Sequence, residues 1–209
     1  MNKLENLKRL IRNLFFDLRY GKFLGGVKKT KFASRGAVDT ANSDYLALSY
    51  IFKNRVFPQK HILVDVGCGK GRVLNFWLDN YPKHRLYGIE LDPDVASQTA
   101  KRLKAYENVT IVEGDVINHL PNEPALFYLF NPFDCNVMNK FISVLLTQYY
   151  DLDSGWQLPF EIIYYNPKCL NEFTNDRFNM LEIELPARFH KCVLISQRSK
   201  DLGLVSPDH

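Results

Sequence analysis

The sequence lacks any long uncharged hydrophobic run. No apolar stretch in its 209 residues reaches the roughly 20 residues that a membrane-spanning helix needs. The first residues also lack the features of a secretory signal, because Lys3, Lys8, Arg9 and Arg12 interrupt the leucines and no small-residue cleavage site follows. We therefore expect a cytoplasmic protein.

Cysteine is scarce and scattered. None of the four cysteines, Cys68, Cys135, Cys169 and Cys192, forms a CxxC pair of the kind that zinc sites use. We therefore expect neither a metal site nor a disulfide framework. We interpret the cysteines as small apolar residues in or near strands.

Excess charge is absent from most of the chain. The formal net charge is +4, but residues 1–31 alone hold nine Lys or Arg and two acidic residues, a local net charge of +7. The remaining residues hold eighteen basic and twenty-one acidic side chains, a net charge of −3. This distribution disfavours a nucleic-acid surface over the whole domain, and it leaves open a contact between the N-terminal segment and a polyanion.

The N-terminal segment has the periodicity of an amphipathic helix that ends near Tyr20. Its apolar stripe consists of Leu4, Leu7, Ile11, Leu14 and Leu18. Lys and Arg occupy the other face. The stripe either packs on the domain, the interpretation that we prefer, or docks on an anionic membrane surface or acceptor.

From His61 onward, near-continuous apolar runs alternate with amphipathic segments. Strands are expected at residues 61–66, 85–91, 109–115, 125–130 and 161–166, and helices at 72–80, 94–107, 116–120 and 136–151. This alternation predicts an α/β fold with a mostly parallel sheet and helices on both faces. Two further runs, at 180–187 and 190–197, lie too close together for a parallel crossover and predict a C-terminal antiparallel hairpin, which makes seven strands. A second helix is expected near residues 43–53. We divide the chain into a helical arm and lid, residues 1–58, and a main domain, residues 59–209.

A glycine loop joins the first expected strand to a helix. It reads Asp65-Val66-Gly67-Cys68-Gly69-Lys70-Gly71. Its glycines let the backbone approach a ligand without a Cβ in the way, and the helix N-terminus that follows suits a carboxylate. The G-x-G-x-G spacing differs from the dinucleotide G-x-G-x-x-G, and Asp65 can attract an ammonium group. The string resembles the first motif of class I methyltransferases, which bind S-adenosylmethionine (SAM). We expect Asp65, Gly67, Gly69 and Gly71 to bind this cofactor.

Two further acids end successive strands. Glu90 follows the glycine loop by about 20 residues, where an acid can accept both hydroxyls of a ribose. NAD enzymes share that feature. Asp115 ends the third strand in a Gly-Asp string that resembles the methyltransferase position bonded to the adenine amino group. Leu91 and Val116 would flank the adenine ring, whereas we interpret Asp92 as a turn or helix-cap residue.

The fourth strand ends in Asn131-Pro132-Phe133-Asp134. This string resembles the catalytic motif of methyltransferases that modify nitrogen, although the commoner motif has two prolines. Asn131 would border the cofactor and hold the N–H of an amine, Phe133 would pack on the substrate or the methyl group, and Asp134 would help remove a proton. The alternative is an Asn-Pro turn that merely ends the strand.

Joined together, several strings resemble one family. They are RGAVDTANSDY, LVDVGCGKGRVLNFWL, GIELDP, EGDVI, LFYLFNPF and IIYYNP. They resemble small bacterial class I SAM-dependent methyltransferases with a Rossmann-like fold, which are distantly similar to non-SET protein lysine methyltransferases. The resemblance covers most of the chain from about residue 19 onward.

The resemblance implies a loop over the cofactor upstream of the sheet. Arg35, Asp39, Thr40 and Tyr45 would lie in it, with the Thr40 and Tyr45 hydroxyls near the SAM carboxylate. The alternative is a helix capped by Ser43, with Tyr45 in the core.

The resemblance implies methyl transfer to a nucleophilic acceptor, and we expect an amine nitrogen of a protein lysine or a small molecule. Similar proteins of this length accompany surface-polysaccharide genes, so a sugar or its precursor is the alternative acceptor. A further alternative is a module that binds SAM or a partner without chemistry. Nucleic acid is not expected as the acceptor because the main domain carries net negative charge.

Overall fold

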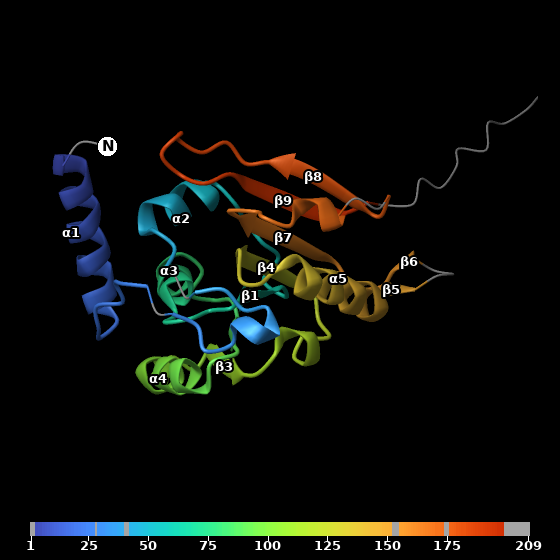
Figure 1. Ribbon diagram of the computed structural model, residues 1–209, viewed down its shortest axis with the longest axis horizontal. Helices are drawn as coiled ribbons and strands as arrows, with labels where there is room; N and C mark the ends of the chain where they lie inside the picture. The colour runs from blue at the N-terminus through green and yellow to red at the C-terminus, as the bar shows by residue number, and fades with distance from the viewer. Residues whose placement is uncertain (1–2, 28, 40–41, 152–154, 174–175, 199–209) are drawn as a thin grey trace, which may run out of the picture.

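Seven strands form one sheet in the order β3-β2-β1-β4-β7-β9-β8 (Figure 1). This computed structural model describes the chain except for residues 1–2, 28, 40–41, 152–154, 174–175 and 199–209. The sheet strands are β1 (Ile62–Val66), β2 (Leu86–Glu90), β3 (Val109–Glu113), β4 (Ala125–Phe130), β7 (Phe160–Tyr165), β8 (Phe178–Glu182) and β9 (Cys192–Gln197). The α-helices are α1 (Lys3–Arg19), α2 (Tyr45–Ile51), α3 (Arg72–Asn80), α4 (Pro93–Leu103) and α5 (Cys135–Tyr149). Shorter elements are the 3₁₀ turns η1 (Ala33–Arg35), η2 (Val116–Asn118) and η3 (Leu170–Phe173) and the two-residue strands β5 (Tyr150–Asp151) and β6 (Gly155–Trp156).

The strand directions confirm the predicted fold class. Strand β1 pairs in parallel with β2 on one side and β4 on the other, β2 pairs in parallel with β3, and β4 with β7. Strand β9 is antiparallel to both β7 and β8, which makes the C-terminal hairpin. The hairpin connection, residues 183–191, is longer than the sequence pattern suggested, because β8 begins and ends earlier than the apolar run.

The two faces of the sheet are covered by different helices. Along β4, Phe127 and Leu129 face a cluster that contains the buried side of α5, whereas Leu126 and Tyr128 face a cluster that contains α2 and α3. A strand that is buried on both faces needs no polar alternation, which is why β1 and β4 read as continuous apolar runs.

Helix α1 forms as predicted, but the preferred interpretation of its apolar stripe is wrong. Leu4, Leu7, Ile11, Leu14 and Leu18 are between 37% and 56% exposed, and they do not pack on the domain. The side that packs carries Asn13, the half-buried Phe16 and Asp17 instead.

Asp17 is the physical reason for this orientation. Its carboxylate accepts two hydrogen bonds from the buried guanidinium of Arg72, at 3.0 Å from Nε and 2.5 Å from Nη2, and a third from the backbone N–H of Leu24. Arg72 begins α3 and is itself buried, and a buried guanidinium requires a counter-charge. Pairing these two charges therefore orients the helix, with its leucines outward. None of the described helices is long and apolar enough to cross a membrane.

The cap of α2 differs from the prediction by one residue. Asp44, not Ser43, is the N-cap, and its side chain accepts a hydrogen bond from the backbone N–H of Leu46 at 2.8 Å. The Ser43 hydroxyl instead bonds to the Tyr128 hydroxyl at 2.8 Å in the core.

Candidate active site

A cavity that is partly open to solvent lies where β1, β2 and β4 end. In an open α/β sheet, ligands bind at this edge. The lining residues that the sequence predicted are Gly67, Glu90, Leu91, Asp115, Val116, Pro132 and Phe133. Asp65, Gly69 and Gly71 belong to the adjoining strand and glycine loop rather than to the cavity wall.

The glycine loop has the backbone that its sequence predicts. Gly67 has φ of +71° and Gly69 of +52°, in the left-handed region where residues with a Cβ are strained. A Cβ at Gly67 would also lie 2.9 Å from the Cβ of Pro132. The glycine loop and the Asn131-Pro132-Phe133 motif therefore touch, although 64 positions separate Gly67 from Asn131 in the sequence.

Glu90 connects β2 to this loop. Its two carboxylate oxygens accept hydrogen bonds from the backbone N–H groups of Gly69, at 2.7 Å, and Asp92, at 2.9 Å. Burial raises the pKa of Glu90, although these N–H groups act against the rise. The hydrogen bonds hold the carboxylate at the cavity wall and leave its remaining lone pairs for a hydroxyl-bearing ligand.

Asp65 lies beside Glu90 in the interior. It is 3% exposed, and its pKa is raised well above the usual range, first by burial and then by the charge of Glu90. A cation near these two interacting acids would stabilise the charged form of each. The ammonium end of SAM fits that chemistry.

Asp115 lies at the opposite wall of the cavity. Its carboxylate caps η2 by accepting from the backbone N–H of Ile117, and it forms an ion pair with Arg35, 3.0 Å from Nη2. Leu91 and Val116 line the cavity near it and supply apolar surface that a flat ring can pack on. Asp92 caps α4, as predicted.

The segment that precedes α2 covers part of the cavity. It contributes Thr30, Phe32, Arg35, Ala37, Val38 and Asp39 to the wall. Its backbone pairs with the Asn131 motif, through an antiparallel bridge from Ala37 to Phe133 and a 2.8 Å hydrogen bond from the Asp134 N–H to the Gly36 carbonyl. The resemblance pointed to a loop here, but nothing in the sequence identified its partner.

The hydroxyl residues predicted in that loop were Thr40 and Tyr45. Thr40 lies outside the described residues. Tyr45 is buried in the core, where its hydroxyl accepts a hydrogen bond from Asn75 at 3.1 Å and Arg72 stacks over its ring. The structure thus does not bring Tyr45 to the cavity.

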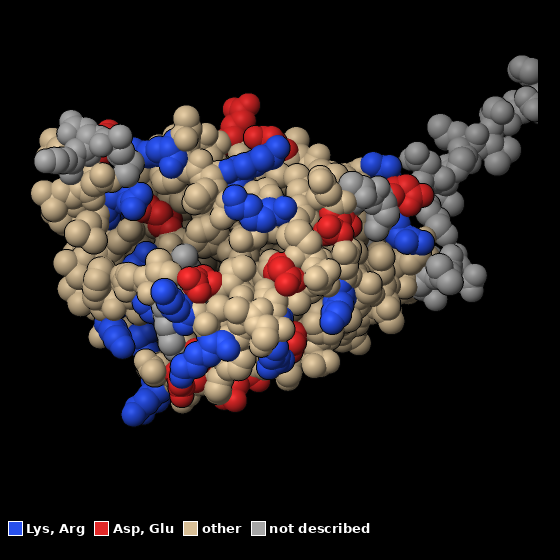
Figure 2. Space-filling view, in the orientation of Figure 1, with Lys and Arg blue, Asp and Glu red and all other residues tan. Residues whose placement is uncertain are grey.

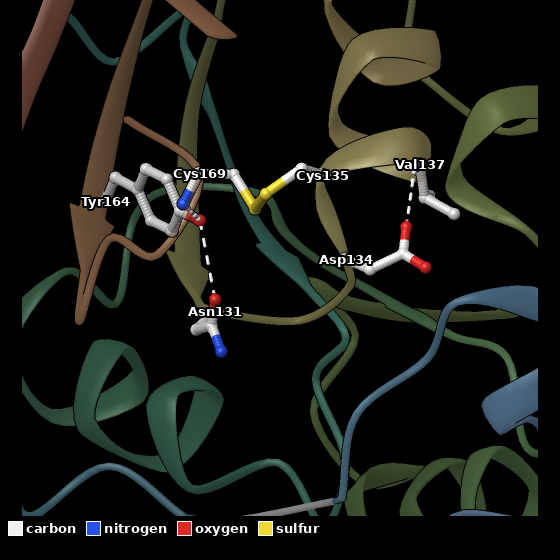
Figure 3. Close-up of a disulfide and its surroundings, with 6 residues drawn as sticks. All are labelled: Asn131, Asp134, Cys135, Val137, Tyr164 and Cys169. Carbon is white, nitrogen blue, oxygen red and sulfur yellow. Dashed lines mark hydrogen bonds between the residues drawn. A yellow bond between two sulfur atoms is a disulfide. The ribbon is translucent and has the colours of Figure 1, made fainter. Parts of the chain in front are cut away.

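Asn131 follows β4 with φ of +44°, a left-handed conformation that asparagine tolerates, and it lies beside the cavity wall, between Phe130 and Pro132, rather than among the lining residues. Figure 3 shows its side-chain oxygen facing the hydroxyl of Tyr164 on β7, which donates to it at 3.5 Å. The left-handed backbone of Asn131 and the hydrogen bond that its amide oxygen accepts from Tyr164 can therefore occur together. Asn166 makes a second Asn-Pro turn, also at positive φ, after the neighbouring strand β7.

Phe133 and Asp134 follow the turn in different settings. Phe133 is buried against Phe141 with one side on the cavity. Asp134 is exposed and does not line the cavity, and its carboxylate caps α5 by accepting from the backbone N–H of Val137 at 2.9 Å (Figure 3).

The expectation of no disulfide is wrong, because Cys135 and Cys169 are bonded (Figure 3). Cys135 begins α5, directly after the Asn131 motif, and Cys169 follows β7. Since β4 and β7 are neighbours in the sheet, the segments after their carboxyl ends meet, and a separation of 34 residues in sequence becomes 5.2 Å between Cα atoms. Cys68 and Cys192 are buried free thiols, consistent with the original interpretation.

Negative charge dominates the cavity wall. Four carboxylates line it, from Asp39, Glu90, Asp92 and Asp115, against one guanidinium, from Arg35. A concave site with this excess attracts cations and repels polyanions.

Comparisons with known proteins agree with this geometry. Residues 64–156 match the model of a family described as a methyltransferase domain. No curated protein matches the sequence significantly. Among solved structures, the SAH-bound Podospora anserina methyltransferase PaMTH1 is similar with a TM-score of 0.57 and 16% identity, over 91% of this chain and 88% of that one.

Other similar structures act on unlike acceptors. The mitomycin 7-O-methyltransferase MmcR has a TM-score of 0.54 and 13% identity over 74% of this chain, which spans only 54% of MmcR. The 23S rRNA methyltransferase ErmE has a TM-score of 0.52 and 14% identity, over 77% of this chain and 70% of that one. These likenesses confirm the Rossmann-like fold and leave the acceptor open.

The family match covers the strands and loops that form the cavity, and the solved structures share the fold. The class of acceptor is a separate question.

Proposed function

We propose that the protein transfers the methyl group of SAM to an amine nitrogen, on a protein lysine or a small molecule. The observation that carries this proposal is the negative cavity wall: with Glu90 and Asp115 assigned to the cofactor, the carboxylates of Asp39 and Asp92 remain for the acceptor. A cationic amine gains from that field, whereas the phosphates of a nucleic acid would be repelled. The resemblance to protein lysine methyltransferases supports the same acceptor.

For the cofactor, the proposal assigns Asp65 to the ammonium end, Glu90 to the ribose hydroxyls and Asp115 to the adenine amino group, with Leu91 and Val116 on the ring. Gly67, Gly69 and Gly71 keep the backbone close. The bound SAM supplies an electrophilic methyl group on a sulfonium.

The residues of the chain act on the acceptor amine by positioning it and through the charge of the cavity wall. Asn131 presents its amide oxygen at the end of β4, and the Tyr164 hydroxyl, which also accepts from the Cys169 N–H, donates to that oxygen. An ammonium has no lone pair, so the amine first loses a proton to solvent. The Asn131 amide oxygen can then accept an N–H of the neutral amine and orient its lone pair toward the methyl group, whose transfer releases S-adenosylhomocysteine. Pro132 and Phe133 belong to the apolar part of the wall, which would exclude water from the amine. The Asp134 carboxylate is engaged as the cap of α5, so we place the orienting role on Asn131.

The test compares two glycine substitutions. Asn131→Gly keeps the left-handed turn and removes only the side chain. We expect turnover to fall by about 10²-fold while the SAM affinity stays within about twofold, because a contact made chiefly in the transition state is lost. Asn166→Gly makes the same change in the neighbouring turn and should keep full turnover. Equal turnover in wild type and Asn131→Gly would remove Asn131 from the active site.

The acceptor itself is identified with methyl-labelled SAM. Labelled SAM is incubated with the protein and separate fractions of polyamines and small amines, lysine-rich protein, sugar nucleotides and glycans, and RNA. Label in the amine or lysine fraction supports the proposal. Label confined to sugar hydroxyls or to RNA overturns the amine assignment while leaving the methyltransferase itself in place.

A further inference from the structure

Helix α1 exposes a continuous apolar face. Its members are Leu7, Leu10, Ile11, Leu14, Phe15 and Leu18, which are between 37% and 67% exposed. At 3.6 residues per turn these positions share one side of the helix. We call them the α1 apolar face. So many large hydrophobic side chains on one exposed helix side mark a surface that binds something.

The helix is fixed with this face outward. Its opposite side is attached to the domain by Asp17 on Arg72 and by Asn13, whose side-chain amide donates to Asp44 at 3.1 Å. Figure 1 shows α1 at the left edge of the molecule, beside α2, and the edge that it forms in Figure 2 is largely tan, with blue side chains next to it. Because polar anchors hold the inner side, the apolar face cannot turn inward without breaking a buried ion pair.

Basic side chains adjoin the apolar face. Lys8, Arg12 and Arg19 follow one line along the helix at spacings of four and seven, and all three are exposed, with Arg19 also paired with Asp79. Lys22 and Lys29 continue the positive charge into the next loop, where Phe23 and Val27 are exposed hydrophobics, whereas Lys31 pairs with Asp94. Glu5 is the exposed acid of the helix, whereas Asp17 is buried and paired.

We infer that α1 docks on an anionic membrane surface, lying in the plane of the headgroups with its apolar face among the acyl chains. A helix with exposed leucines and phenylalanine, bordered by lysine and arginine, combines the two interactions by which interfacial helices bind lipid. The lysines and arginines complement the phosphates and carboxylates of anionic headgroups. The charge concentrates in residues 1–31, at +7, whereas the rest of the chain has −3, so the attraction orients the protein with α1 toward the membrane.

The test measures co-sedimentation of the full chain with vesicles. We expect binding to phosphatidylcholine vesicles that contain phosphatidylserine, at least tenfold weaker binding to pure phosphatidylcholine, and loss of most binding at high salt. The variant Ile11→Ser/Phe15→Ser should lower the affinity for anionic vesicles by at least tenfold, and Lys8→Gln/Arg12→Gln should lower it severalfold. All four side chains are exposed, so the melting temperature should stay unchanged.

The matched control is Val56→Ser/Leu181→Ser, which removes two exposed hydrophobics away from α1 and should bind as wild type does. If the double α1 variant melts at a lower temperature, the single Phe15→Ser variant decides in its place. The proposal is overturned if wild type binds neither vesicle, or if the α1 variants bind as well as wild type. It is also overturned if wild type is a dimer in sedimentation equilibrium and the α1 variants are monomers, since the face would then belong to a second copy.

Discussion

Asp65 is expected to make SAM binding depend on pH. The folded protein raises the pKa of this carboxyl well above its usual range, by burial and by the neighbouring Glu90. A carboxyl that keeps its proton in the free protein must lose it to pair with the ammonium of SAM. Below the raised pKa, binding therefore releases up to one proton from Asp65, and affinity should rise by up to about tenfold, or about 1.4 kcal/mol, per pH unit. Above that pKa the carboxylate is already charged, and the dependence vanishes.

Calorimetric titration at several pH values, each in two buffers of different ionisation enthalpy, measures both the slope and the protons released. Asp65→Asn should bind SAM more weakly and with a shallower slope, and the remaining slope should come from Glu90, whose pKa is also raised by burial. The exposed acid Glu113, changed to Gln, is the control and should keep the wild-type slope. A wild-type affinity that does not change from the ordinary carboxyl range upward would refute the pairing of Asp65 with the ammonium.

The free protein should show the opposite dependence. Because folding raises the pKa of Asp65, the folded state holds this proton more tightly than the unfolded state does. The contribution of Asp65 to stability is therefore fully present below the unfolded pKa and is lost as the pH rises through the folded pKa. Saturating SAM should oppose that loss, which thermal melts with and without SAM can measure.

Two further substitutions test the site and the attachment of α1. Glu90→Ala should weaken SAM binding by about 1.5–3 kcal/mol in calorimetry, because the ribose hydroxyls lose a charged acceptor. It should also lower the melting temperature, because the N–H groups of Gly69 and Asp92 lose their acceptor. Undiminished affinity would exclude Glu90 from the site. Asp17→Ala should destabilise the fold by about 3–5 kcal/mol in denaturant unfolding, because it leaves the Arg72 guanidinium buried without its partner. Arg9→Ala, which breaks a more exposed ion pair of the same helix with Asp44, should cost at most about 1 kcal/mol, and equal losses from the two variants would contradict this account.

Local patterns in the sequence predicted most of the elements and several of the residues that line the cavity. Strands β1 and β4 are continuous apolar runs because both of their faces are buried. Gly67 and Gly69 have the positive φ values that their spacing implied. Glu90 and Asp115 reach the cavity because parallel strands end at the same edge. Each of these inferences uses residues within one strand–loop unit, where sequence spacing and spatial distance agree.

Two of the missed features depend on contacts between distant segments. The Cys135–Cys169 bond follows from the pairing of β4 with β7, which no spacing of cysteines reveals. The bridge from Ala37 to Phe133 joins residues 96 positions apart, and a strand pairing of one residue leaves no periodic pattern. The sequence placed Asp134 beside the substrate for its chemistry, whereas its position before α5 made it a cap.

The orientation of α1 shows how a single pair of charges can outweigh a hydrophobic pattern. Periodicity identified the stripe and therefore the helix, but it assumed that the apolar side is the buried side. The domain surface beneath α1 contains the buried Arg72, and leucines placed over it would leave its charge uncompensated at a cost of several kcal/mol. Asp17 removes that cost only when the leucines point outward. The same ion pair that stabilises the domain therefore creates the exposed face, and a membrane surface that covers this face would recover the hydrophobic stabilisation that folding alone leaves unused.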